Sequence, residues 1–155
     1  MEISDLIKKY LAEAKMLQLA TSADNQPWVC NVWFAADDSL NIYWFSSTTR
    51  RHSQEVAKNP NVAAAIVTQH DPAGETGVGL QIQGVAEQLN DQEDIAAARS
   101  VYEGRIFDAK TIDGLMANPD KPHKFYRLKP NLFVLFDPIN FPDETRQEWK
   151  PGKNE

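Results

Sequence analysis

The stretch MLQLATSADNQPWVCNVWFAADDSLNIYWFS, residues 16–46, decides the fold class of this chain. It contains three runs rich in β-branched and aromatic residues, and short polar turns at residues 24–27 and 37–39 separate them. Runs joined by such turns are typical of antiparallel hairpins. The sequence therefore predicts three consecutive strands in a meander.

A helix is expected on each side of this meander. Upstream, apolar residues recur at spacings of three and four, with charged residues between them, which predicts an amphipathic helix over residues 3–15. Downstream, residues 49–58 begin with polar side chains and end at Asn59-Pro60, which predicts a short helix.

More strand-like segments follow. Residues 61–68, NVAAAIVT, are almost wholly apolar and predict a strand that is buried on both faces. Residues 70–77 are rich in turn formers and predict a loop or hairpin tip. Residues 78–89 alternate apolar and polar side chains, which predicts a long half-buried strand with Gly84 as a bulge or a point of close approach.

The last third of the chain adds a helix, an irregular segment and the final strands. Asn90 or Asp91 is expected to cap the helix, which Gly104 ends. After an irregular or short helical segment, the runs HKFYRL and NLFVLF predict one or two strands, and the polar tail from Glu144 is expected to be loose except at Trp149. Six or so mostly consecutive strands with few helices favour a mainly β fold, a small antiparallel barrel with helical additions.

Composition limits the class of protein. The chain has 155 residues, which fits a single domain over residues 1–155, and its net charge of −6 disfavours nucleic-acid binding. The longest apolar run, residues 62–67, is far shorter than the roughly 20 residues of a transmembrane helix. Cys30 is the only cysteine and no signal peptide is evident, so a cytoplasmic location is expected.

The most informative polar segment is SSTTRRHS, residues 46–53, where a strand ends and a helix begins. Cations are unfavourable at the electropositive start of a helix unless an anion, such as a phosphate, shares the site. Alternatively, a hydroxyl group caps the helix while Arg50 and Arg51 point into water or pair with Glu55 and other carboxylates. The spacing alone leaves both interpretations open.

Other candidate groups are less specific. Trp33 and Phe34, beside Asn31, face the aromatic residues 43–45 of the next expected strand, which indicates core packing or, alternatively, a flat heteroaromatic ligand. The three histidines lie far apart in sequence and belong to no zinc motif. Cys30 is expected to be a buried and inert thiol.

The order of these parts resembles a known family. The segment LATSADNQPWVCNVWFAADDSLNIYWFSSTTRRHSQEVAKNPNVAAAIV, residues 19–67, and the later LQIQGVAEQL, residues 80–89, are similar to the pyridoxine 5′-phosphate oxidase-like, FMN-binding split-barrel superfamily. The shared series is a strand, a turn, an aromatic strand ending in serine, a basic pair, a helix stopped by Asn-Pro, and an apolar strand. The likeness covers residues 3–90 and continues more loosely to residue 136.

This resemblance implies a six-stranded antiparallel split β-barrel and a homodimer that holds FMN at its interface. The resemblance implies a set of cofactor-binding residues: Cys30, Asn31, Val32, Trp33, Phe45, Ser46, Ser47, Arg51, His52 and Trp149. Arg51 and His52 would grip the phosphate, with Ser46 and Ser47 donating hydrogen bonds to it. Trp149 would reach the flavin of the partner.

Three departures from the family's oxidases change what is expected. Those oxidases have Arg in place of Cys30, Lys in place of His52, and a lysine for the substrate phosphate in place of Ala35. Pyridoxine phosphate is therefore a poor substrate candidate, and FMN binding is expected to be weaker or to involve Arg50.

Three functional hypotheses follow. The first is an FMN-dependent oxidoreductase that acts on an unknown small molecule. The second is a non-catalytic sensor or scavenger of flavin, haem or deazaflavin; haem would require an axial ligand such as His70 or His123. The third is a structural dimer that has lost its cofactor.

Overall fold

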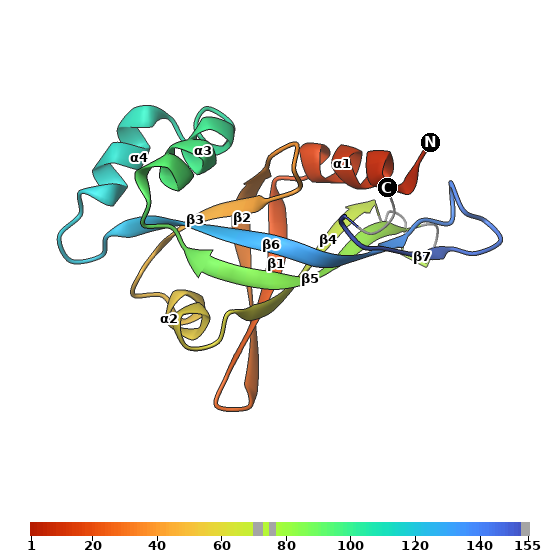
Figure 1. The fold of residues 1–155 in the computed structure, drawn as a ribbon, viewed down its shortest axis with the longest axis horizontal. Coiled ribbons are helices and arrows are strands. Elements are labelled where there is room, and N and C mark those ends of the chain that lie inside the picture. The colour runs from red at the N-terminus through yellow and green to blue at the C-terminus, as the bar shows by residue number, and fades with distance from the viewer. Residues whose placement is uncertain (70–72, 75–76, 153–155) are drawn as a thin grey trace.

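The computed structural model describes residues 1–69, 73–74 and 77–152, so most of the loop expected at residues 70–77 lies outside the described residues (Figure 1). The helices are α1 (Ile3–Glu13), α2 (Arg51–Lys58), α3 (Gln92–Tyr102) and α4 (Ala109–Met116). The strands are β1 (Met16–Ala23), β2 (Gln26–Ala36), β3 (Ile42–Ser47), β4 (Asn61–Gln69), β5 (Val78–Gln88), β6 (His123–Phe136) and β7 (Arg146–Trp149). None of the described helices has both the length and the apolar character needed to span a bilayer.

The strands form an antiparallel barrel. Their order is β3-β2-β1-β4-β5-β6-β7, and a further pairing of β3 with β6 closes a ring of six strands. The predicted fold class, mainly β with a six-stranded split barrel, is confirmed. The loose tail was a wrong prediction, because residues 146–149 form β7 and pair with residues 133–136 of β6.

The barrel is split beside β2. This strand pairs with β1 from Gln26 to Trp33, whereas it pairs with β3 only through Phe34, Ala35 and Ala36. The stretch from Gln26 to Trp33 therefore has no strand on its second side within the described chain. This free edge of β2 positions the candidate site.

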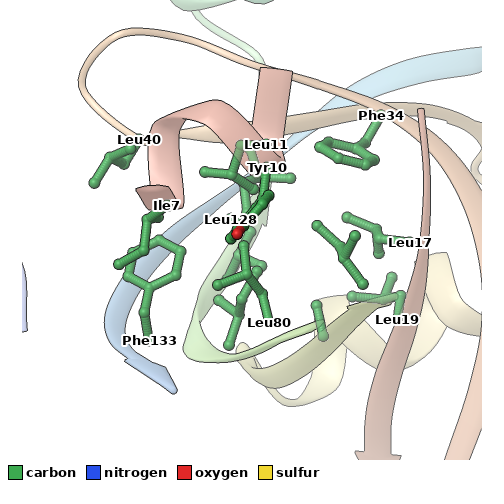
Figure 2. Close-up of a cluster of buried hydrophobic side chains, with 14 of the residues drawn as sticks. Ile7, Tyr10, Leu11, Leu17, Leu19, Phe34, Leu40, Leu80, Leu128 and Phe133 are labelled. Atoms are coloured by element: carbon green, nitrogen blue, oxygen red, sulfur yellow. The ribbon is translucent and has the colours of Figure 1, made fainter. Parts of the chain in front are cut away.

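A tightly packed core fills the barrel beneath α1. Leu17 and Leu19 of β1, Leu80 of β5 and Leu128 of β6 are at most 1% exposed, and Figure 2 shows them gathered under the helix. Tyr10 of α1 donates a hydrogen bond of 2.7 Å to the buried Asp137 carboxylate, just after β6. Burial pushes the pKa of Asp137 up, but the hydrogen bonds it accepts outweigh burial and lower the pKa overall.

A second, smaller core lies under α3 and α4. Ala35, Tyr43 and Phe45 pack there against Tyr102 and Phe125. Figure 1 shows α3 and α4 together on one side of the sheet and α2 on the opposite side. The side chain of Asp91, at the expected N-cap of α3, makes no capping hydrogen bond.

Two expectations for the central strands had different outcomes. The bulge at Gly84 is confirmed, because the register of β5 against β6 shifts there and a Cβ atom would lie 2.4 Å from the Lys129 carbonyl oxygen. Burial of β4 on both faces is wrong for the single chain. Val62 and Ile66 are buried, but Val67 is 59% exposed because its face of the sheet is uncovered.

Candidate functional site

A cleft of about 480 Å³ lies where the free edge of β2, the end of β3 and the start of α2 meet. Its lining includes nine of the ten predicted site residues: Cys30, Asn31, Val32, Trp33, Phe45, Ser46, Ser47, Arg51 and His52. Trp149 is the exception, since it lies on β7 and packs on Phe133 of the barrel. Three separate elements thus bring the predicted residues together, and any role of Trp149 toward a partner stays a prediction.

The wall formed by β2 offers backbone groups as well as side chains. The Phe34 N–H donates to the Lys15 carbonyl at 2.8 Å, on the β1 side of the strand. Because these groups alternate in direction along an antiparallel strand, the N–H and C=O groups of Val29, Asn31 and Trp33 point away from β1. They face the free edge, where a planar ligand with donors and acceptors on its rim would find partners.

The floor of the cleft contains the N-terminus of α2. The helix begins at Arg51, two residues later than predicted, and no side chain caps it at Arg50. Its first hydrogen bond runs from the Gln54 N–H to the Arg50 carbonyl at 3.1 Å, so the N–H groups of residues 51–53 precede it. These groups give this end of the cleft a partial positive charge.

Arg51 lies between two neighbours at the rim of the cleft. Its Nε donates to Glu55 Oε2 at 2.9 Å, and its guanidinium carbon lies 4.0 Å from the centre of the Trp28 ring. The pairing of Arg51 with Glu55, one part of the alternative interpretation, is therefore confirmed, whereas the hydroxyl cap of that interpretation is wrong because no side chain caps the helix. The pairing does not remove Arg51 from the cleft, because the side chain remains 46% exposed and lines it.

His52 is buried beside the end of β3. Its Nε2 atom lies 3.0 Å from Ser46 Oγ, within hydrogen-bond distance. Burial, and then the charge of Arg50, lower the pKa of His52, so its ring is neutral at pH 7. The hydroxyl of Ser47 is also engaged, with Thr49 Oγ1 at 2.8 Å.

Four of the described residues that line the cleft lie outside the predicted set, although the sequence named Arg50 and His123 as possible contributors. His123 reaches the cleft because β6 places it opposite Ser47, and its ring packs 5.2 Å from that of Phe45. Met16 and Trp28 join from β1 and β2, and Arg50 joins from the turn before α2. Only the pairing of distant strands brings His123 here, so no local motif could have identified it.

Cys30 and Ala35, two positions at which the family's oxidases have basic residues, carry no charge near the cleft. Cys30 is half-buried rather than fully buried, and burial, followed by the charge of Glu55, raises the pKa of its thiol. Ala35 is 1% exposed and belongs to the second core. Among the described residues, no group of three or more His, Cys, Asp or Glu side chains is arranged to hold a metal ion.

One curated relative shares sequence with this chain. UPF0306 protein plu4501 from Photorhabdus laumondii is 28% identical over 96 residues, which cover 61% of this chain and 66% of the relative.

Solved structures of other proteins share the fold, including the following three. HutZ, the haem storage protein of Vibrio cholerae, is 25% identical, with a TM-score of 0.63 over 84% of this chain and 91% of HutZ. A FAD-binding protein from Mesorhizobium loti is 23% identical, with a TM-score of 0.63 over 85% of this chain and 90% of that protein. A haem-binding protein from Mycobacterium smegmatis is 16% identical, with a TM-score of 0.76 over 97% of this chain but only 59% of that protein.

The family model described as pyridoxamine 5′-phosphate oxidase matches residues 3–133, which include the barrel up to β6 and every residue of the cleft. The ring of six antiparallel strands is consistent with this match. The chain belongs to the pyridoxamine 5′-phosphate oxidase family.

Proposed function

We propose that this chain binds FMN in the cleft between β2, β3 and α2. The observation that carries the proposal is the position of Arg51 and of the uncapped α2 N-terminus at one end of this cleft. A guanidinium, backbone N–H groups and a positive helix end together match a phosphate dianion. Arg51, a cation that is unfavourable at a helix start, would then serve to bind the phosphate.

The other end of the cleft suits a ring system. Trp33 presents a large apolar surface there, and Val32 closes the cleft from the core side, whereas Trp28 lies against Arg51 at the phosphate end. The free backbone groups of β2 offer hydrogen bonds to the rim of an isoalloxazine, as does the Nδ2 group of Asn31, whose Oδ1 accepts a hydrogen bond from Gln18. The FAD-binding relative from Mesorhizobium loti supports a flavin in this fold.

A homodimer is part of the proposal. The face of the sheet that bears Asn31 and Trp33 continues into an apolar groove of about 360 Å³ lined by Ala20, Val29 and Ala63 among others. Exposed apolar surface of this kind is typical of an interface between proteins. A second copy on this face would cover the open side of the cleft and also bury the outer face of β4.

The chemistry proposed is a two-electron redox reaction on a small molecule, which bound FMN would supply. The chain's own part is to hold the phosphate with Arg51, to fix the ring against β2 and to exclude water with the tryptophans. Ala35 supports a substrate without a phosphate, because this position is apolar and buried and is not part of the cleft lining.

Haem is the second candidate ligand, and His123 is the observation that favours it. Its imidazole lines the cleft beside Phe45 and would supply the axial ligand that haem requires. HutZ, at 25% identity, supports haem in this fold.

The absorption spectrum of the purified protein, followed by identification of the chromophore released by heat, tests the proposal. A flavin spectrum and released FMN are expected. A Soret band that is lost in His123→Ala would favour haem instead. A colourless protein that binds neither added FMN nor added haemin would contradict both candidates and leave a structural role.

A further inference from the structure

We infer that Thr21 and Glu55, which lie behind the cleft, determine its preference for a phosphorylated ligand by orienting the guanidinium of Arg51. This inference rests on the proposed function and deepens it. Neither residue lines the cleft, so both are positioning residues rather than binding residues.

A buried carboxylate anchors the arginine. Glu55 lies one helical turn after Arg51 on α2, and it is 8% exposed. Its Oε1 accepts a hydrogen bond of 2.7 Å from the Thr21 hydroxyl, and its Oε2 accepts the one of 2.9 Å from Arg51 Nε. Thr21 is itself 2% exposed, so the position of the barrel wall fixes the carboxylate and, through it, the arginine.

The same hairpin supplies the second support of Arg51. Trp28 lies directly opposite Thr21 in the pairing of β1 with β2, and residues directly opposite each other present their side chains on one face. This face meets α2. The guanidinium therefore lies with the Trp28 ring against its carbon and Glu55 at its Nε. Because Nε makes the internal bond, the two terminal nitrogens remain for the bidentate contact that a phosphate favours.

The charge of Glu55 makes the inference sharply testable. Hydrogen bonds from Thr21 and Arg51 lower the pKa of Glu55, so it is an anion at pH 7 close to the proposed phosphate. If Glu55 acted only through its charge, it would repel the phosphate and its neutralisation would tighten binding. If it acts by orienting Arg51, loss of its contacts weakens binding.

The decisive variant is Thr21→Val, which removes the hydroxyl and keeps every charge. Dissociation constants for FMN and riboflavin are measured by flavin fluorescence, and the ratio of the two is compared with wild type. We expect this preference for FMN to fall about tenfold, because a charge-assisted bidentate contact depends on geometry. Thr21→Ser, which keeps the hydroxyl, is expected to retain the preference, as is Ser22→Ala, the matched control on the same strand.

The ratio of the two dissociation constants separates a loss of orientation from a loss of folding. A partly unfolded sample lowers the apparent affinity for FMN and for riboflavin by the same factor, so it leaves the ratio unchanged. Glu55→Gln gives the second measurement. Weaker FMN binding in this variant supports the inference, whereas tighter binding overturns it.

The remaining outcomes separate the inference from the proposed function. If Thr21→Val keeps the wild-type preference for FMN over riboflavin, the inference is overturned while the proposed function stands. If the wild type binds both flavins equally, Arg51 does not select the phosphate and the inference fails, although flavin binding survives. If the wild type binds neither, the proposed function fails and takes the inference with it.

Discussion

At the residue scale, the phosphate proposal depends on a cation at a position where helices disfavour one. Arg51 is the first residue of α2, next to N–H groups whose partial charge has the same sign. Its salt bridge to Glu55 contributes about 1 kcal/mol or less, which is of the same order as this repulsion, so the two largely cancel. The terminal nitrogens of Arg51 and the helix N–H groups still present positive charge to the cleft, and an anionic ligand would neutralise it.

Substitution of Arg51 tests this role directly. Arg51→Ala is expected to weaken FMN binding by about tenfold or more, because a hydrogen bond to a charged group contributes about 1.5–3 kcal/mol. Riboflavin, which lacks the phosphate, serves as the control ligand and should lose little affinity. Titration at rising salt should weaken FMN binding alone. Equal losses for both flavins would contradict the assignment of Arg51.

The buried His52 predicts a dependence of stability on pH. Its pKa in the folded chain is lowered below the usual 6.5 by burial and then by Arg50. As the pH falls through 6.5, the unfolded chain takes up a proton that folded His52 resists, so the free energy of unfolding decreases.

Urea unfolding at about pH 7.5 and about pH 5.5 measures this effect. The wild type should lose more stability between the two values than His52→Gln, in which the other histidines still titrate. An identical loss in both proteins would show that His52 does not contribute to the pH dependence.

At the scale of elements, the bulge in β5 lets β5 and β6 approach closely. A Cβ atom on Gly84 would lie 2.4 Å from the Lys129 carbonyl oxygen and 2.7 Å from Leu128 Cδ1. A backbone oxygen cannot move without disturbing the strand pairing. The glycine is therefore required by packing between two strands rather than by an unusual φ angle.

Gly84→Ala is expected to destabilise the fold by about 2 kcal/mol, in the range of other overpacked sites. Gly114→Ala is the matched control, because its Cβ would meet no atom within 4 Å on α4 and alanine favours a helix by about 1 kcal/mol. Urea unfolding of both variants gives the comparison. Similar stabilities for the two would rule out the close contact.

At the scale of the whole molecule, the uncovered face of the sheet is the main feature that a single chain leaves unexplained. Val29 and Val67 are each 59% exposed, on the same outer face of β2 and β4. The sequence predicted burial of β4 on both faces, and in the single chain only one face is buried. A second copy on this face would satisfy both observations.

Val29→Glu tests the proposed dimer. An unpaired carboxylate in an apolar interface costs about 3 kcal/mol or more, so the variant should sediment as a monomer and bind FMN more weakly than wild type. Ile139→Glu, at a residue that is 61% exposed and outside the groove, is the control and should behave as wild type. A monomeric wild type, or a monomeric variant with unchanged FMN affinity, would contradict a shared site.

The sequence alone determined the parts that depend on neighbours along the chain. The strand runs around residues 16–46, the short helix that ends at Lys58 and the glycine at position 84 follow from local periodicity and turn chemistry. The basic pair therefore indicated the candidate site from sequence alone, whereas the choice of Glu55 as the partner of Arg51 depended on the structure.

Tertiary structure decided what depends on strand register. The pairing of β3 with β6 brings His123 into the cleft, the short pairing of β2 with β3 leaves the free edge, and β7 forms where a loose tail was expected. The alignment of Thr21 with Glu55 is of the same kind. Local sequence carries the period of a strand but not the identity of its distant neighbour, because that choice is fixed by burial summed over the whole barrel.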